Sequence, residues 1–372
     1  MKKKILIDAN PIVPYFALGK TNGIGRTCME LIRELDKQRE ALPFAIELFT
    51  QNLKGVSAKR LQTGFKTHHL YLRNIESHNR LSRCLHLREL LSGYALQHIT
   101  HNYEIVTDPS KCIVTVHDAM FFSYPEAFLG AEENKKRVPP FVRQAKHVIT
   151  ISENSKREIM RYMNVPEERI TVIPWGVDHT LLYPHEVKSN RWSGNEPYFT
   201  SVSCDKGRKN TITLLKAYQE YAKNSPAHHL ILVWRNPTAE ALELADKPEL
   251  KGKVHFASNL SNEELADIYA GATASFFPSL YEGFGLPILE SMACGVPCVT
   301  CRNSSLEEVG GEAAIYVEPL NMAAMAHEME KFENGDYDME RLRSASFSQA
   351  SKFTWERCAD ETIKVYRQCL GI

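Results

Sequence analysis

One stretch of the chain decides its fold class, and it reads PSLYEGFGLPILESMACGVP over residues 278–297. An apolar run leads into a loop that contains Gly283 and Gly285, and a further apolar run follows from Pro287 to Gly295. Glycine lets the backbone approach a ligand closely and suits the end of a helix, and proline suits the first helical turn. The stretch therefore predicts a strand, a loop and a helix whose first N–H groups face phosphate or sugar oxygens.

The same alternation of short β-branched runs with longer amphipathic runs extends in both directions from this stretch. It is typical of parallel sheets covered by helices. The predicted strands are 5–7, 113–116, 147–151, 170–173, 198–202, 229–234, 254–256, 274–277 and 298–300. The predicted helices are 26–35, 153–160, 210–221, 263–269, 287–293 and 353–370. The fold class is therefore α/β, with doubly wound parallel sheets.

Two domains are expected, because the chain has 372 residues and a single core stops growing at roughly 250 to 300. A polar segment rich in proline and glycine, 174–197, interrupts the pattern and predicts a linker. We predict an N-terminal domain over 1–183, a C-terminal domain over 184–352, and a helix over 353–372 that packs back toward the N-terminal domain. Ligands of such sheets bind outside the carboxyl ends of the strands, so we expect the substrate in a cleft between the domains.

The composition excludes several classes of protein. Apolar residues make up 43% and charged residues 24% of the chain, which rules out disordered, collagen-like and coiled-coil proteins. The 45 basic residues equal the 45 acidic ones, so no net field favours a nucleic-acid partner. Nine cysteines without a small-domain disulfide framework indicate a reducing compartment. No run approaches a signal peptide or the roughly 20 apolar residues of a membrane span, so we expect a cytoplasmic protein.

Charged residues near the two glycine loops of the second half suit a sugar attached to a diphosphate. Glu282 precedes the predicted helix and Glu290 lies within it, and a carboxylate can accept hydrogen bonds from two neighbouring hydroxyls. Arg208 and Lys209 precede another helix, where two cations beside a positive dipole favour a dianionic ligand. The alternatives are an ordinary helix cap for each glutamate and a solvated basic turn for the cation pair.

Two segments of the first half also end predicted strands. His117 and Asp118 follow an apolar strand, and a histidine there can donate or accept a proton near neutral pH, although a structural hydrogen bond is the alternative. Gly23 and Gly25 open a helix after the first strand, but Cys28 stands where a dinucleotide fingerprint requires a small residue. A nicotinamide site is therefore disfavoured, and a plain glycine turn is the alternative.

Together these motifs resemble the retaining nucleotide-sugar glycosyltransferases of family 4, often called group 1. In the second half, residues 278–297 are similar to the E-x7-E signature of that family, and residues 208–210 are similar to its R-K-N/G segment. In the first half, residues 117–126 are similar to its H-D-x-x-F-x-x-x-P-E segment. Residues 23–27 are similar to its G-I-G-R-Y loop, with threonine in place of the aromatic residue. The resemblance covers nearly the whole chain. It implies the GT-B fold, in which two Rossmann-like domains face each other across a cleft.

The resemblance also implies which residues act on the donor. The implied catalytic residues are His117, Glu282, Lys209 and Arg208. The implied donor-binding residues are Gly23, Gly25, Gly283, Phe284, Gly285, Leu286, Glu290 and Asp118. In the family the first glutamate contacts sugar hydroxyls, the second holds the ribose, the cations bind the diphosphate, and the histidine meets the sugar near the reacting carbon.

The implied reaction is transfer of a hexose, with mannose from GDP-mannose as the first choice and UDP-sugars as the second. The acceptor is a glycan or a lipid-linked glycan in bacterial cell-surface polysaccharide or glycolipid synthesis. The anomeric configuration is retained, and neither a metal nor another cofactor takes part. The alternatives are a non-catalytic nucleotide-sugar-binding protein and a GT-B epimerase or phosphorylase.

Two remaining patterns resemble metal sites. Cys294, Cys298 and Cys301 have the spacing of an iron–sulfur motif, but the first is expected at a helix end and the others on a strand, so they cannot readily converge. Asp336 and Asp338 form a D-x-D pattern, for which helix capping is the simpler explanation. We therefore predict no metal site.

Residues 54–90 hold eight Lys or Arg side chains against two Glu. Such a basic stretch is either a solvated face or a peripheral contact with an anionic membrane or a lipid diphosphate acceptor. The second reading places the protein at the cytoplasmic face of the inner membrane.

Overall fold

The computed structural model describes residues 2–18, 23–52, 57–71, 80, 84–85, 93–101, 108–202, 207–224 and 226–372. The chain forms two compact units, and the first consists of Met1–Gly176 together with Trp355–Ile372. The second unit is Val177–Thr354, so the chain enters it before the boundary expected at residue 183. The chain is already joined to the second unit at this point, because the N–H of Val177 donates to the carbonyl of Phe353 over 3.2 Å.

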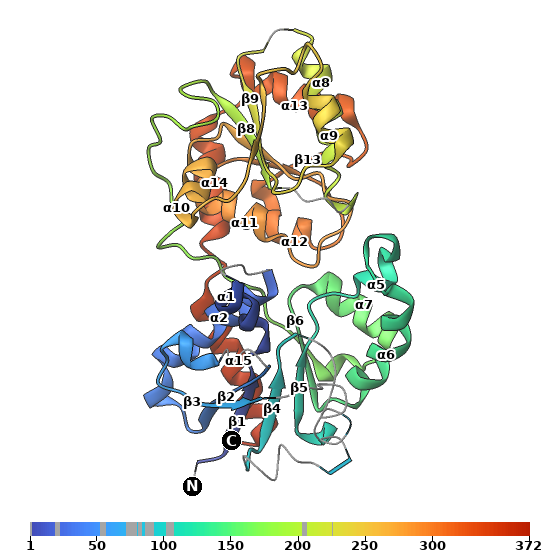
Figure 1. Cartoon of the computed structure of the whole chain (residues 1–372), viewed down its shortest axis with the longest axis vertical. Helices are drawn as coiled ribbons and strands as arrows, with labels where there is room; N and C mark the ends of the chain where they lie inside the picture. Colours follow the sequence, from blue (N-terminus) through green and yellow to red (C-terminus); the bar gives the residue numbers. More distant parts are fainter. Residues whose placement is uncertain are drawn as a thin grey trace. The chain divides into compact units, whose positions relative to one another are not determined.

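The first unit is built on a seven-stranded parallel sheet with the strand order β3-β2-β1-β4-β5-β6-β7 (Figure 1). The strands are β1 (Lys4–Asp8), β2 (Ala45–Gln51), β3 (Lys66–Leu70), β4 (Leu96–Ile99), β5 (Cys112–Thr115), β6 (His147–Thr150) and β7 (Ile170–Val172). Ile5 of β1 is in register with Ile46 of β2 and Leu96 of β4. The carboxyl ends of β1, β4 and β5 therefore lie at one edge of the sheet.

Helices cover both faces of this sheet. They are α1 (Val13–Leu18), α2 (Gly23–Lys37), α5 (Met120–Ser123), α6 (Ala131–Gln144), α7 (Glu153–Met163) and α15 (Trp355–Leu370). Side chains alternate along each strand, so Ile113 packs in a core with α2 and α15 while its neighbour Val114 packs in a second core with α6 and α7. This burial on both faces explains why the strands are short, continuous apolar runs.

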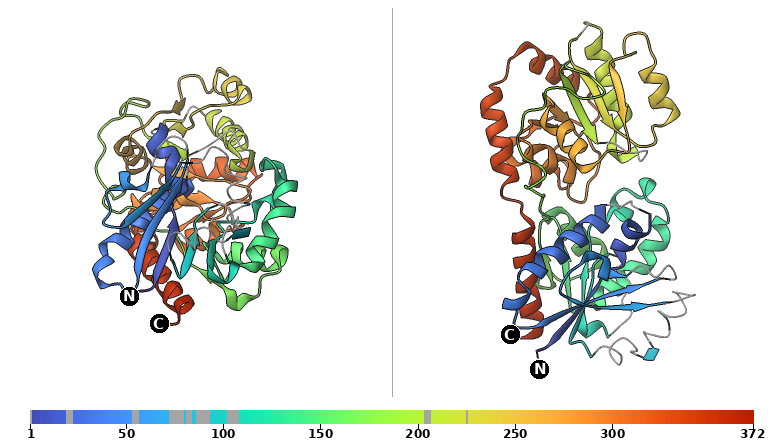
Figure 2. Two further views of the ribbon diagram at one scale, coloured as in Figure 1. Left: turned by 60° about the horizontal axis from the view of Figure 1, so that its bottom comes forward. Right: turned by 60° about the vertical axis from the view of Figure 1, so that its left-hand side comes forward.

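The C-terminal helix α15 lies alongside α2 in the first unit (Figure 2). The sequence predicts Trp355, Ala359, Ile363 and Tyr366 on one face of this helix, and all four side chains are buried. Lys3 donates from Nζ to the carbonyl of Leu370 over 2.6 Å. This bond joins the residue just before β1 to the end of α15.

The second unit is built on a six-stranded parallel sheet with the order β10-β9-β8-β11-β12-β13. Its strands are β8 (Tyr198–Val202), β9 (His229–Val233), β10 (Val254–Ala257), β11 (Ala274–Phe276), β12 (Cys298–Thr300) and β13 (Ile315–Tyr316). Its helices are α8 (Thr211–Ala222), α9 (Ala239–Ala245), α10 (Asn262–Ala270), α11 (Leu286–Ala293), α12 (Leu306–Gly310), α13 (Met322–Asn334) and α14 (Met339–Ala350). Helices α8, α9 and α13 share one core with the sheet. Helices α10, α11, α12 and α14 contact one another, and α14 also packs against that core through Met339 and Leu342 (Figure 1).

Side-chain oxygens cap the starts of two helices. Ser152 begins α7, and its side chain accepts from the backbone N–H of Ser155 over 3.1 Å. Asp338 of the D-x-D pattern begins α14 and accepts from the N–H of Arg341 over 3.0 Å. The prediction that Asp338 caps a helix is therefore confirmed.

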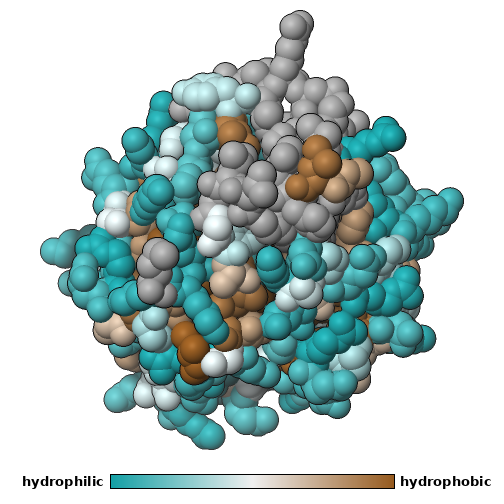
Figure 3. All heavy atoms as spheres, turned by 90° about the horizontal axis from the view of Figure 1, so that it is seen from below, coloured by the Kyte–Doolittle hydropathy of each residue, from teal (hydrophilic) through white to brown (hydrophobic). Residues whose placement is uncertain are grey.

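The described residues include no helix that is long and apolar enough to cross a membrane. The coloured residues in Figure 3 are mostly hydrophilic, and the apolar ones form small separate groups. Most of the basic stretch 54–90 lies outside the described residues, so its contact with a membrane stays a prediction.

Candidate active site

Three of the four predicted catalytic residues meet in the second unit. Arg208 and Lys209 lie in a short helical turn, η7 (Gly207–Lys209), before α8, and Glu282 lies in the loop between β11 and α11. Arg208 Nη1 is 2.5 Å from Glu282 Oε2, and Lys209 Nζ is 2.6 Å from Glu282 Oε1. None of the three side chains is more than 18% exposed. We call these three residues the cation–carboxylate cluster.

The electrostatics of the cluster favour an ionised Glu282. Burial alone raises the pKa of this carboxyl, but the charges of Lys209 and Arg208 outweigh burial, and the net pKa lies below the ordinary value. Two cations and one carboxylate leave one positive charge. A guanidinium carries five N–H donors and an ammonium three, more than one carboxylate accepts, so the cluster can hold a second anion.

The two loops that carry the cluster are joined by hydrogen bonds to backbone carbonyl groups. The N–H of Leu280 donates to the carbonyl of Arg208 over 2.7 Å, and Arg208 Nη1 donates to the carbonyl of Tyr281 over 3.1 Å. Asn210 donates from Nδ2 to the carbonyl of Pro278 over 3.0 Å. These bonds place the cations and the carboxylate on one surface at the carboxyl edge of the second sheet.

The predicted glycine loop leads directly into α11. Gly285 caps this helix with φ at 109°, a left-handed conformation that favours glycine. A Cβ atom at Gly285 would lie 3.2 Å from the side chain of Leu306, so the chain is also closely packed here. Gly283 and Phe284 form the preceding loop, and Leu286 is the first residue of α11.

The second glutamate of the signature has a different partner from the first. Glu290 is buried in α11, and its Oε2 accepts from the hydroxyl of Tyr269 in α10 over 3.2 Å. The prediction that Glu282 and Glu290 act on different parts of an extended ligand agrees with these separate partners. Its contact with a ribose stays a prediction.

His117 lies at the carboxyl edge of the first sheet and is only 6% exposed. Its Nε2 is 2.9 Å from the carbonyl of Thr100. A carbonyl can only accept, so Nε2 carries the proton and Nδ1 is the acceptor. Among the residues that the structure describes, the buried Nδ1 has no hydrogen-bond partner. Burial lowers the pKa of His117 to about 4, with a smaller lowering by the nearby His101, although the hydrogen bond to Thr100 acts in the opposite direction. The ring is therefore neutral at physiological pH.

His117 also lines a small cavity in the first unit, together with Thr27, Thr100 and Trp175. The cavity volume is about 30 Å³, similar to the volume that one molecule occupies in liquid water. The ring of Trp175 lies 5.2 Å from that of His117. This cavity is too small for a sugar, so the predicted contact of His117 with the donor stays a prediction.

The remaining predicted residues of the first unit lie at the starts of helices. Asp118 Oδ1 accepts from the N–H of Met120 at the start of α5 over 3.0 Å. Gly23 is the first residue of α2, and Gly25 is buried in its first turn. Residues 19–22, which precede that helix, lie outside the described residues. The contacts of Asp118, Gly23 and Gly25 with a donor stay predictions.

The sequence analysis missed Tyr269, Ser304 and Ser305 at the site of the second unit. Ser304 and Ser305 lie in the loop after β12, and hydroxyls in the loop that follows a buried strand are the signal that could have found them. Tyr269 gives no such signal, because it lies within an ordinary amphipathic helix.

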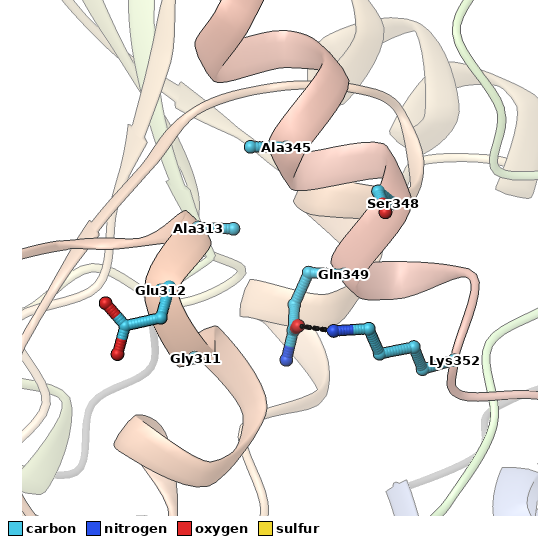
Figure 4. A pocket seen from close by; sticks show the side chains of 7 residues that line it. All are labelled: Gly311, Glu312, Ala313, Ala345, Ser348, Gln349 and Lys352. Atoms are coloured by element: carbon cyan, nitrogen blue, oxygen red, sulfur yellow. Dashed lines mark hydrogen bonds between the residues drawn. The ribbon is translucent and has the colours of Figure 1, made fainter.

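A separate open pocket of about 410 Å³ lies between η8 (Gly311–Ala313) and the last turns of α14 (Figure 4). Lys352 donates from Nζ to Gln349 Oε1 over 2.8 Å at its rim. None of the predicted site residues lines this pocket. In the part of the chain that the structure describes, no three His, Cys, Asp or Glu side chains are grouped to hold a metal ion.

Two family models match the chain in succession. Glycosyltransferase Family 4 matches residues 21–181, and Glycosyl transferases group 1 matches residues 184–349. The chain belongs to the group 1, family 4 glycosyltransferases. The match spans both sheets and includes every residue that we predict to be catalytic.

Named relatives of this glycosyltransferase include O-antigen chain mannosyltransferase B of Escherichia coli, which is 28% identical over 93% of this chain and 96% of the relative. O-antigen chain mannosyltransferase RfbU of Salmonella typhimurium is 32% identical over 55% of this chain and 56% of the relative. The solved structure of Anabaena HepE in complex with UDP and glucose superposes with a TM-score of 0.75 at 17% identity, covering 98% of this chain and 100% of HepE. This likeness confirms the two-domain GT-B fold.

Proposed function

We propose that this glycosyltransferase moves mannose from GDP-mannose to a hydroxyl of a growing glycan, with retention at the anomeric carbon. The proposed setting is the cytoplasmic synthesis of a bacterial cell-surface polysaccharide. The two relatives named as O-antigen mannosyltransferases support the sugar and the setting. The cation–carboxylate cluster is the observation that supports the reaction.

In the proposed reaction the cluster stabilises the diphosphate leaving group. Arg208 and Lys209 contribute fixed positive charges in a site that is largely shielded from water, where such charges act more strongly than in solution. The first N–H groups of α11 add a dipole of the same sign. Glu282 is already ionised and accepts hydrogen bonds from the hydroxyls of the sugar.

Retention follows in this proposal from attack on the leaving-group side of the sugar. Glu282 is held between two cations, which makes its carboxylate a poor nucleophile. The acceptor oxygen therefore forms the new bond to the anomeric carbon as the bond to the diphosphate breaks. A phosphate oxygen of the leaving group takes the proton of the acceptor hydroxyl. The charges of Arg208 and Lys209 make a metal ion unnecessary for this step.

A donor panel tests the proposed function. Melting temperatures are measured with GDP-mannose, UDP-glucose, UDP-galactose and UDP-N-acetylglucosamine, because a ligand that binds only the native state raises the melting temperature. We expect GDP-mannose to give the largest shift and to release GDP only when a mannan acceptor is present. A shift without GDP release indicates a binding protein, and a larger shift with a UDP-sugar contradicts the proposed donor. Nuclear magnetic resonance of the product reports its anomeric configuration.

A further inference from the structure

Two hydroxyl groups from a third loop hold the backbone of Glu282 on both sides. Ser304 Oγ accepts from the N–H of Glu282 over 3.0 Å. Ser305 Oγ lies 2.9 Å from the carbonyl of Glu282 and 2.8 Å from that of Phe284. Ser305 is fully buried, so water does not compete for these bonds. Both peptide groups of the glutamate are therefore fixed by consecutive serines.

These bonds also set the direction of the N–H groups in the same loop. In a trans peptide the C=O and the N–H point in opposite directions. With the carbonyls of Glu282 and Phe284 turned toward Ser305, the N–H groups of Gly283 and Gly285 point toward the opposite side of the loop. One buried hydroxyl thus orients two amides at the start of α11.

Ser304 has a backbone conformation that suits glycine better than serine, which indicates that its hydroxyl has a role. Its φ is 47°, in the left-handed region that is unfavourable for a residue with a Cβ atom. A glycine would adopt this conformation at lower cost, but only a side-chain oxygen can accept from the N–H of Glu282. Asn303 secures the other end of the loop, because its Nδ2 donates to the carbonyl of Ser279 over 3.0 Å.

We propose that Ser304 and Ser305 are positioning residues that aim Glu282 at the hydroxyls of the donor sugar. Arg208 and Lys209 hold the diphosphate, and the two serines fix the carboxylate relative to it. This inference rests on the proposed function of the cluster. It predicts that the serines govern recognition of the sugar and leave recognition of the nucleotide unchanged.

The test compares Ser304→Gly and Ser305→Ala with a matched control, Ser346→Ala. Ser346 is as fully buried as Ser305, but its hydroxyl has no hydrogen-bond partner. Dissociation constants for GDP and GDP-mannose, kcat, KM and the melting temperature are measured for each variant. If the donor panel selects UDP-glucose, UDP and UDP-glucose replace the two ligands.

We expect Ser304→Gly to keep or raise the melting temperature, since glycine relieves the left-handed backbone. Its kcat/KM falls roughly three- to tenfold, the effect of one hydrogen bond, while its affinity for GDP stays within about twofold of wild type. Ser305→Ala gives a larger loss in the same direction, and Ser346→Ala gives none.

Wild-type kcat/KM in Ser304→Gly would overturn the inference, and so would an equal loss of affinity for GDP and for GDP-mannose. The kinetic and binding results for Ser304→Gly test the inference even if the Ser305→Ala protein does not fold. Failure of the wild-type protein to bind or turn over any donor in the panel instead overturns the proposed function. The two failures are therefore distinguishable.

Discussion

At the scale of single residues, Glu282 has two partners that a donor diphosphate would also attract. Arg208 and Lys209 both bond to its carboxylate, which therefore competes with a phosphate for the same cations. In the proposed function the same carboxylate also binds the sugar. Affinity for the nucleotide and affinity for the sugar are thus expected to respond in opposite directions when its charge is removed.

Glu282→Gln is expected to bind GDP more tightly than wild type while losing transfer. The substitution raises the net charge of the cluster from one to two, and an extra charge near a phosphate is worth roughly a tenfold change in affinity at protein-like dielectric constants. Calorimetric titration with GDP at fixed ionic strength measures the effect. Glu240→Gln is the control, because it removes the same charge from an exposed glutamate that pairs with Lys216. GDP binding in Glu282→Gln that is equal to or weaker than in wild type would contradict the competition.

The neutral histidines of the first unit predict how stability depends on pH. Burial lowers the pKa of His117 to about 4 and that of His98 to about 3, whereas an unfolded histidine titrates near 6.5. Below about pH 6.5 the unfolded state binds more protons than the native state, so the free energy of unfolding falls as the pH is lowered toward 4. Each histidine contributes a slope of about 1.4 kcal/mol per pH unit in that window.

His117→Gln is expected to show a smaller slope between pH 4.5 and 6.5 than wild type. Urea unfolding at several pH values measures the slope. His327→Gln is the control, because it makes the same substitution at a side chain that is 67% exposed. Equal slopes in wild type and His117→Gln would show that His117 is not a buried neutral group.

At the scale of elements, α15 is joined to the first sheet by a buried polar contact. Tyr366 of α15 lies with its hydroxyl 2.6 Å from His98 Nδ1, and His98 Nε2 lies 2.7 Å from Thr115 Oγ1. All of these side chains are buried. Both ring nitrogens of His98 therefore have a hydrogen-bond partner. This explains why a histidine can be buried within β4.

Tyr366→Phe is expected to lower the free energy of unfolding by about 1 to 3 kcal/mol, because it leaves a buried ring nitrogen of His98 without a partner. Urea unfolding at pH 7 measures the change. Tyr71→Phe removes a hydroxyl from a side chain that is 71% exposed and serves as the control. An unchanged free energy in Tyr366→Phe would show that water or another group satisfies His98.

The predicted strands correspond to nine of the thirteen strands that the structure describes, and β2, β3, β4 and β13 are missed. Two of the missed elements have clear physical reasons. Strand β4 is missed because Gln97 and His98 interrupt its apolar pattern, and the partners that make them tolerable lie far away in the chain. Helix α6 is missed because it contains Pro139 and Pro140, and proline normally disfavours a helix interior. Local pattern therefore finds elements whose side chains follow the usual periodicity.

The candidate site is predicted to a similar extent. The motifs identify Arg208, Lys209 and Glu282 as residues of one donor site, but their ion pairs depend on how two loops far apart in sequence approach each other. Ser304 and Ser305 are missed because serines after a strand are common, and only their bonds to the backbone of Glu282 distinguish them. Tertiary contacts thus supply what residue type and spacing cannot.

At the scale of the whole molecule, the proposed function has side-chain cations supply the charge that a metal ion supplies in many transferases. Transfer is therefore expected to continue at an unchanged rate in the presence of EDTA. The rate of GDP release from GDP-mannose with acceptor measures this, with Mg²⁺ and Mn²⁺ added back in parallel. A loss with EDTA that either ion restores would contradict the proposed role of Arg208 and Lys209.

The most direct test of the central claim is the rate of transfer by Lys209→Ala, with Lys216→Ala as its matched control. Lys216 lies nearby in α8 but is 45% exposed and pairs with Glu240. With both variants folded by circular dichroism, Lys209→Ala is predicted to lose roughly a hundredfold or more in kcat, while Lys216→Ala keeps the wild-type rate. A folded Lys209→Ala protein that transfers sugar at the wild-type rate would contradict the account.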